Sequence, residues 1–232
     1  MPTPLLKTRL IRVLSLASCA FLGGCPSFSS YTRARTITEG EVQVFVAPQI
    51  ETLTLGTSPL TEPQIEFGAR YGLTPNVEIG GKIWVPGFLL DGKFQLHRSA
   101  TELTGWDICV VPGIGYLGGF SGTRSGTGSS LQTATFYAPI LFGYNLHGGD
   151  QVVLTARLVD QIQSTSGRSG GTVNLLYGGG SVGYAWKVGQ HVRIMPEISI
   201  GYPLLASVSS FGTEFGTGIM YVQGGIGFLF GD

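Results

Sequence analysis

The feature that most constrains the fold is an alternation of apolar and polar residues that recurs along most of the chain. Successive side chains of a β-strand point to opposite faces, so a period of two predicts strands with one apolar and one polar face. The segment after Pro63 shows this pattern. Its apolar residues are Ile65, Phe67, Ala69 and Tyr71, and they alternate with Glu66, Gly68 and Arg70. Glycine and β-branched residues interrupt every candidate helix. We therefore expect an all-β chain of about ten strands, within a range of 8–12.

The composition favours strands that face lipid. Charged residues make up 12% of the chain, and 37 of its 232 residues are glycine. A soluble domain usually has about 25% charged residues and about 7% glycine. Without the three bases at the N-terminus, 11 basic and 14 acidic residues remain. This weakly acidic balance gives no basic footprint for nucleic acid, so we expect no nucleic-acid partner.

The first 24 residues have the pattern of an export signal. Lys7, Arg9 and Arg12 form a basic start, and an apolar stretch from residue 13 ends in small residues. The following Leu22-Gly23-Gly24-Cys25 resembles a bacterial lipobox, in which the cysteine is acylated and becomes the first residue of the mature protein. The resemblance implies a removed signal over 1–24, a lipidated linker over 25–38 with the lipid on Cys25, and a barrel over 39–232.

Two alternatives for the N-terminus stay open. Cys19 also follows small residues, but only six residues separate it from Arg12, fewer than the ~7–15 of a signal h-region. The chain could also carry an ordinary cleaved signal, with Cys25 incidental. With the lipid on Cys25, Cys109 is the one remaining cysteine, so no disulfide can form within the mature chain.

The connections favour a closed barrel over a soluble periplasmic β-sandwich, which is the main alternative fold. Long connections rich in Gly, Ser and Thr are expected at Pro48–Thr61, Gly118–Leu131, Ser164–Gly171 and Pro203–Thr217, with a short exception at Pro86-Gly87. Tight turns are expected around Pro75, Gly148-Gly149 and Gly189. Long outer loops alternating with short periplasmic turns are typical of antiparallel transmembrane up-and-down β-barrels.

Two segments carry a family resemblance. Residues Tyr71 to Gly80 are similar to hairpins frequent in bacterial outer-membrane barrels, and Ile226 to Phe230 resembles the aromatic C-terminal strand of such barrels, although Gly231-Asp232 follows it. The resemblance implies a location in the bacterial outer membrane, with the N-terminus anchored by lipid on the periplasmic side. It also implies two partners, which are outer-membrane lipid and the barrel assembly machinery. No partner of the outer loops can be named.

The strand faces predict which side chains meet lipid and which line the lumen. The expected outward set is Ile65, Phe67, Val77, Ile79, Phe94, Ile108, Val110, Phe142, Leu154 and Ile198. The expected lumen charge network is Glu66, Arg70, Glu78, Lys82, Asp91, Lys93, Arg157, Arg193 and Glu197, with Glu41 and Asp107 on the same faces. Pairing across the Pro75 turn can place Arg70 beside Glu78. Near-balanced charge favours a plugged lumen over a selective pore, in which rings of one sign are expected.

The remaining motifs favour structure over chemistry. Two Gly-x-Gly-x-x-Gly stretches, beginning at Gly113 and Gly178, are followed by no helix, so we expect neither a dinucleotide site nor any other cofactor. No histidine pair has a metal-ligand spacing, and we expect no metal and no catalytic residue. A set of aromatic residues near strand ends predicts a membrane-interface girdle: Tyr71, Trp84, Trp106, Tyr116, Tyr144, Trp186 and Tyr202.

These observations lead to three hypotheses for function. The first is a non-enzymatic, lipid-anchored outer-membrane barrel with a plugged lumen, which acts structurally or through its loops. The second is a narrow solute channel. The third is an outer-membrane enzyme that modifies lipids.

Overall fold

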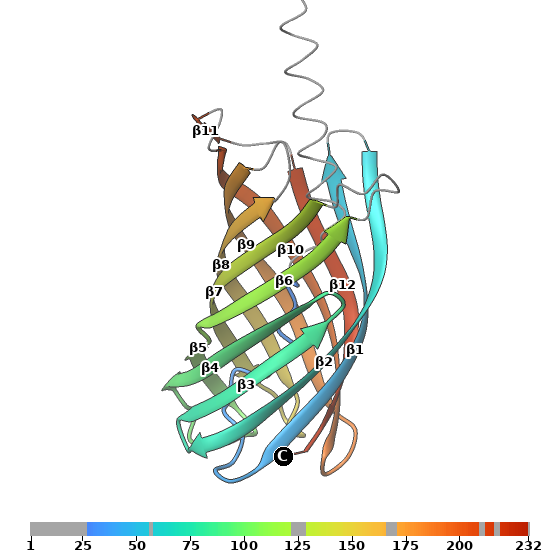
Figure 1. Ribbon diagram of the computed structural model, residues 1–232. Helices are drawn as coiled ribbons and strands as arrows, with labels where there is room; N and C mark the ends of the chain where they lie inside the picture. The colour runs from blue at the N-terminus through green and yellow to red at the C-terminus, as the bar shows by residue number, and fades with distance from the viewer. Residues whose placement is uncertain are drawn as a thin grey trace, which may run out of the picture.

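The protein is a closed, antiparallel β-barrel of 10 strands, as the sequence predicts (Figure 1). The computed structural model describes residues 27–55, 58–121, 129–165, 171–208, 212–215 and 219–231. Each strand pairs with its neighbours in sequence, and the last closes onto the first. The strands are β1 (Val42–Leu55), β2 (Ser58–Thr74), β3 (Val77–Trp84), β4 (Gly87–His97), β5 (Gly105–Val110) continued by β6 (Gly113–Ser121), β7 (Ser129–Asn145), β8 (Gln151–Thr165), β9 (Gly171–Lys187), β10 (Val192–Val208) and β12 (Ile219–Phe230).

Two irregularities explain why twelve strand segments make ten strands. β5 and β6 are two parts of one strand, since both pair with β4 on one side and β7 on the other, and the break falls at Val111-Pro112. The short β11 (Gly212–Phe215) pairs with the end of β10 in the connection to β12. Among the described residues, no helix is long and apolar enough to cross a membrane.

The two ends of the barrel differ. At the short-turn end, drawn at the bottom of Figure 1, tight turns join β2 to β3, β7 to β8 and β9 to β10, and the C-terminus lies there too. The opposite, long-loop end carries the connections after β1, β6, β8 and β10. The short link at Pro86-Gly87 is also present, between β3 and β4.

One expected loop is largely strand. We expected residues 48–61 to form an outer loop, but β1 and β2 pair from Val42↔Tyr71 up to Leu55↔Ser58. The side chains alternate through this region, with Gln49 and Glu51 buried and Ile50 57% exposed. The polar residues here are the inward half of a strand, so their polarity is no signal of a loop. Parts of the other expected outer loops lie outside the described residues.

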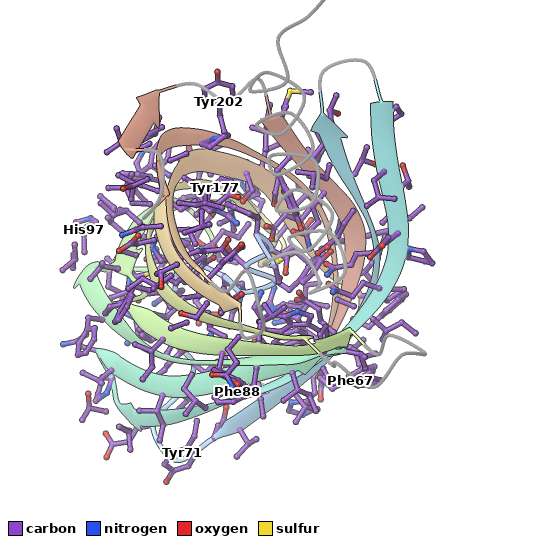
Figure 2. The ribbon with its side chains drawn as sticks, turned by 45° about the horizontal axis from the view of Figure 1, so that its top comes forward. Phe67, Tyr71, Phe88, His97, Tyr177 and Tyr202 are labelled. Atoms are coloured by element: carbon purple, nitrogen blue, oxygen red, sulfur yellow. The ribbon has the colours of Figure 1, made fainter. Side chains whose placement is uncertain are left out.

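The outer face is apolar as predicted. Phe67 and Phe88 point away from the lumen, whereas Tyr177 points into it (Figure 2). The ten residues of the expected outward set are all half-buried or exposed. Six of the seven expected girdle aromatics are also exposed, but Trp84 is only 7% exposed because its position in β3 has the inward parity of Lys82. Glu41, expected to face the lumen, is exposed and precedes the first strand.

An arginine placed on this outer face should destabilise the protein. Phe94 and Ile79 are 43% and 49% exposed on the outer side of β4 and β3. If this face meets lipid, as the sequence predicts, a cation there leaves water for hydrocarbon, so Phe94→Arg and Ile79→Arg should each lower the free energy of unfolding by about 2–4 kcal/mol. Urea unfolding in lipid vesicles measures the change, with Phe94→Leu as the control. Wild-type stability in both arginine variants would contradict this assignment of the outer face.

Candidate functional site in the barrel lumen

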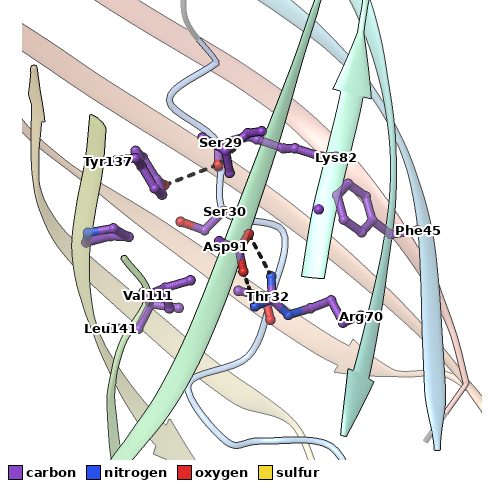
Figure 3. Close-up of a pocket in the computed structure, with 13 residues that line it drawn as sticks. Ser29, Ser30, Thr32, Phe45, Arg70, Lys82, Asp91, Val111, Tyr137 and Leu141 are labelled. Carbon is purple, nitrogen blue, oxygen red and sulfur yellow. Dashed lines mark hydrogen bonds and ion pairs between the residues drawn. The ribbon is translucent and has the colours of Figure 1, made fainter. Parts of the chain in front are cut away.

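The N-terminal part of the described chain lies inside the barrel. Residues 27–37, which we call the lumen segment, run along the lumen from Ser27 to Ile37 near the short-turn end (Figures 1 and 3). All but the half-buried Ser30 are buried, and Phe28 and Ala34 have no exposed surface. These residues belong to the linker expected over 25–38. Residues 1–26, with the expected signal and the lipid site Cys25, lie outside the described residues.

The barrel wall supplies acceptors for the backbone of the lumen segment. Irregular backbone has no ladder partners, so each buried N–H needs an acceptor from elsewhere. Carboxylates and amides of the wall accept from six N–H groups of the segment. Phe28 N donates to Gln223 at 2.8 Å, and Ser30 N and Tyr31 N donate to Glu197 at 2.9 and 3.0 Å. Ala34 N donates to Gln151 at 2.8 Å, Thr36 N to Gln95 at 2.7 Å, and Ile37 N to Glu78. The segment is therefore held in one register by wall side chains.

Glycines in the wall leave space for the large side chains of the segment. A Cβ at Gly227 would come within 2.7 Å of the Tyr31 ring, and one at Gly201 within 3.0 Å of the Phe28 ring. Ala34 similarly packs where Gly143 has no side chain. The wall and the segment are thus complementary in shape as well as in hydrogen bonding.

This complementarity predicts a compensating pair of substitutions. Gly227→Ala should destabilise the barrel by about 1–3 kcal/mol, because the added methyl group overlaps Tyr31. All three nearest atoms to that methyl group belong to Tyr31, so in a Tyr31→Ala background the same change should cost much less. A double-mutant cycle from urea unfolding measures the coupling. Additive effects would show that Tyr31 does not lie against Gly227.

A chain of ion pairs lies on the inner face of the wall beside the segment. Arg70 Nη2 lies 2.5 Å from Asp91 Oδ1 (Figure 3), and Arg70 Nε lies 2.8 Å from Glu78 Oε2. Lys93 Nζ is 3.1 Å from Glu78 Oε1. Gly80 stands opposite Arg70 in the ladder and leaves room for the guanidinium to reach Glu78 diagonally. The structure thus brings together the Arg70–Glu78 pair predicted from the hairpin.

The other residues of the expected network also lie in the lumen. Lys82 Nζ is 3.3 Å from Glu66 and donates to Ser27 Oγ and Ser29 O at 2.5 and 2.8 Å. Arg157 Nη2 is 3.6 Å from Glu197. Arg193, which is 3% exposed, donates to the carbonyl of Gly149. Acids and bases of the wall therefore form ion pairs with one another and hydrogen bonds with the segment.

The short-turn end holds a second polar cluster. Asp107, fully buried, accepts from Ser99 N at 2.8 Å, Asn145 Nδ2 at 2.7 Å and Gln151 Nε2 at 3.1 Å. Arg35 of the segment lies 3.7 Å from Asp107. Sequence alternation placed Asp107 inward but gave no sign of Arg35, because the segment has no periodicity.

Little free space remains beside the segment. A cavity of about 20 Å³ is lined by Ser29, Ser30, Arg70, Lys82, Asp91 and Tyr137, among others (Figure 3). One water molecule fills such a volume. The described residues contain no cluster of three or more His, Cys, Asp or Glu that could hold a metal ion.

Apolar side chains gather in one part of the lumen. Ten buried apolar residues form one cluster, which includes Phe28 of the segment with Trp84, Leu117, Val159, Tyr177 and Tyr221 of the wall. Phe28 lies against Tyr177 and Tyr221, with ring centroids 5.6 and 4.5 Å apart. Buried polar side chains of β7 and β8 stand among them, namely Thr133, Thr135 and Gln161, so this part of the lumen is mixed in polarity.

Comparison with known proteins shows similarity in fold. No protein-family model matches the sequence, and no curated protein matches it. Neisserial surface protein A is 11% identical, with a TM-score of 0.45 over 83% of this chain and 99% of that one. Outer membrane protease OmpT from Escherichia coli is 11% identical, with a TM-score of 0.47 over 85% and 98%. The translocator domain of autotransporter NalP from Neisseria meningitidis is 10% identical, with a TM-score of 0.43 over 97% of both chains. At these identities the similarity concerns the fold alone.

Proposed function

We propose that this protein is a non-catalytic barrel of the bacterial outer membrane whose lumen is closed by its own N-terminal segment. Its role is then structural or mediated by the loops at the long-loop end. An apolar outer face bordered by aromatic residues suits a lipid environment. The short-turn end would face the periplasm, as it does in barrels of this kind.

The observation that carries the proposal is the burial of the lumen segment. The segment occupies the centre of the barrel and its backbone is bonded to the wall at six N–H groups. Five ion pairs around it join acids to bases, so neither sign forms a ring that would select a passing ion. The three histidines, His97, His147 and His191, are all exposed, away from these buried acids.

The proposal includes acylation of Cys25, which lies outside the described residues. The described chain begins two residues later at Ser27, and the next residue, Phe28, lies against Gly201 and donates its N–H to Gln223. A lipid on Cys25 would anchor the N-terminus on the periplasmic side, as the sequence suggests.

Current through single molecules in planar bilayers tests the closed lumen. The wild type should carry no steady current, because its lumen is filled. A variant that lacks residues 27–37 should carry an ohmic current, since the wall alone encloses an open path. The Lys187→Ala variant, which changes an exposed charge at the short-turn end, is the control for insertion. Steady wild-type current equal to that of the deletion variant would favour a solute channel.

A further inference from the structure

One acidic residue stands on the otherwise apolar outer face. Asp160 lies two residues after Leu158 on the outward side of β8 and is half-buried. In the part of the ten barrel strands that the structure describes, no other outward position holds Asp, Glu, Lys or Arg. The Asp160 carboxylate has no hydrogen-bond or ion-pair partner among the described residues. Ionisable side chains that face lipid are unfavourable and rare, and they commonly mark a functional site.

A groove of about 580 Å³ lies on the outer face beside Asp160. Small residues line it where β5 passes into β6 and on the two neighbouring strands, namely Gly92, Pro112, Gly113 and Ala138. Larger apolar side chains border it, among them Ile114 and Leu158, which are 59% and 51% exposed. A volume of this size with a mostly apolar lining and a few polar groups is typical of ligand sites.

The groove crosses five strands, from β4 to β9. Its lining follows one line of cross-strand partners, which are Asp91, Gly113, Tyr137, Val159 and Tyr177. Four strand spacings make this line roughly 19 Å long. Leu90 at one end is seven residues from the short-turn end of β4, whereas Leu176 at the other is eleven residues from that of β9. The groove therefore rises toward the long-loop end as it approaches Asp160, and its length suits one acyl chain.

Asp160 lies at the depth expected for lipid headgroups on the long-loop side. It pairs in the ladder with Leu176, two residues from Gly178, which pairs with Tyr202 of the aromatic girdle. Tyrosine side chains of such girdles lie at the membrane interface. Asp160 is also nine residues from the short-turn end of β8, or roughly 23 Å along the barrel axis, close to the ~25 Å height of the apolar band. A lipid head could thus lie at Asp160 with its acyl chain in the groove.

The charge of Asp160 selects the kind of head. A carboxylate accepts hydrogen bonds and attracts a cation, so it favours an ammonium group with N–H donors. A head with a phosphate and no cation would be repelled. A second copy of this chain cannot supply the cation from its outer face, since the outward positions of the described barrel strands hold no Lys or Arg. The groove and the acid together therefore favour a lipid over a homodimer.

We propose that this groove binds one phospholipid with a primary ammonium head, of the phosphatidylethanolamine type. Its acyl chain lies along the groove from Leu90 to Leu176, and its ammonium group donates to Asp160. The inference rests on the proposed function in that the outer face must meet lipid. It does not depend on whether the lumen is closed.

Brominated lipids in vesicles test the site through tryptophan fluorescence. The reporter protein carries Trp106→Phe, Trp186→Phe and Ile162→Trp, which places a tryptophan on the outer face two residues from Asp160, while Trp84 stays buried in the lumen. Quenching by brominated phosphatidylethanolamine and by brominated phosphatidylcholine, each diluted into unbrominated phosphatidylcholine, gives the relative association constant of the two lipids. Phosphatidylethanolamine should bind about fivefold more strongly, because the quaternary ammonium of phosphatidylcholine has no N–H to donate.

Two substitutions and a second groove provide the controls. Asp160→Asn keeps the size of the side chain without its charge, so the preference should vanish. Ala138→Phe fills the groove and should reduce the preference to less than about twofold, whereas Ala69→Phe on the outer face of β2 should leave it unchanged. A groove of about 670 Å³ between β12, β1 and β2 has no charged residue in its lining. A reporter with Phe67→Trp in place of Ile162→Trp lies beside that groove and should show no preference.

Four results would overturn the proposal. These are equal association of the two lipids at the Ile162→Trp reporter, an unchanged preference in Asp160→Asn, an unchanged preference in Ala138→Phe, and the same preference at the Phe67→Trp reporter. If no brominated lipid quenches either reporter, the outer face does not meet lipid, and the membrane location fails together with the site. Conductance of the same preparations tests the closed lumen separately. A conducting protein that keeps the lipid preference would refute the closed lumen alone.

Discussion

Replacing Arg70 with alanine is expected to lower the free energy of unfolding by about 3–5 kcal/mol. The guanidinium is 4% exposed and lies between Asp91 and Glu78, both of which have nearly buried side chains. Its removal leaves two carboxylates facing each other without a shared cation. Only Glu78 retains another base, Lys93. The loss exceeds that of a surface ion pair, because water cannot replace the missing charge.

Urea unfolding in lipid vesicles, followed by tryptophan fluorescence, gives the value for Arg70→Ala. Lys187→Ala is the matched control, because it removes an exposed positive charge from the same barrel and should change stability by less than about 0.5 kcal/mol. In the double variant Arg70→Ala/Asp91→Asn, part of the loss should be recovered, since one of the two unpaired carboxylates is gone. A loss below about 1 kcal/mol in Arg70→Ala would mean that water reaches the site.

Glu197→Ala should have an effect of similar size, about 3–5 kcal/mol, through the lumen segment. Glu197 accepts from Ser30 N and Tyr31 N and pairs with Arg157, whose side chain is fully buried. Without the carboxylate, two backbone N–H groups lose their acceptors and the Arg157 cation is left unpaired. Within the described residues, Nε and Nη1 of Arg157 have no hydrogen-bond partner, and Nη2 otherwise donates to the neutral hydroxyls of Ser181 and Ser30, which cannot replace the charge of Glu197.

The double variant Arg157→Met/Glu197→Ala separates the two causes. It removes the unpaired cation, so it should be more stable than Glu197→Ala alone. The loss that remains then measures the attachment of the segment. In bilayers, Glu197→Ala should show brief current steps that the wild type lacks, because the segment is less firmly held. A double variant as unstable as the single one would assign the whole effect to the backbone hydrogen bonds.

The alternation of the sequence was sufficient to predict the barrel wall. It assigned Ile79 and Phe94 to the outer face, and the hairpin at Pro75 brought Arg70 to Glu78. These features depend on neighbours in sequence: a strand has two faces, and a tight turn fixes which residues pair across it. Where glycines interrupt the alternation, as at Gly178-Gly179-Gly180, the pattern cannot assign a face. For this reason the sequence left the inward position of Tyr177 undecided.

The sequence by itself predicted an antiparallel barrel of about ten strands with an apolar exterior and charges of both signs inside. Only the tertiary structure decided what the interior contains. Residues 27–37 have no periodicity, because an irregular segment takes its conformation from its surroundings and not from its own pattern. Its acceptors come from five different strands and are Glu78, Gln95, Gln151, Glu197 and Gln223. Closure of the barrel brings them together, and no local rule of sequence encodes that convergence.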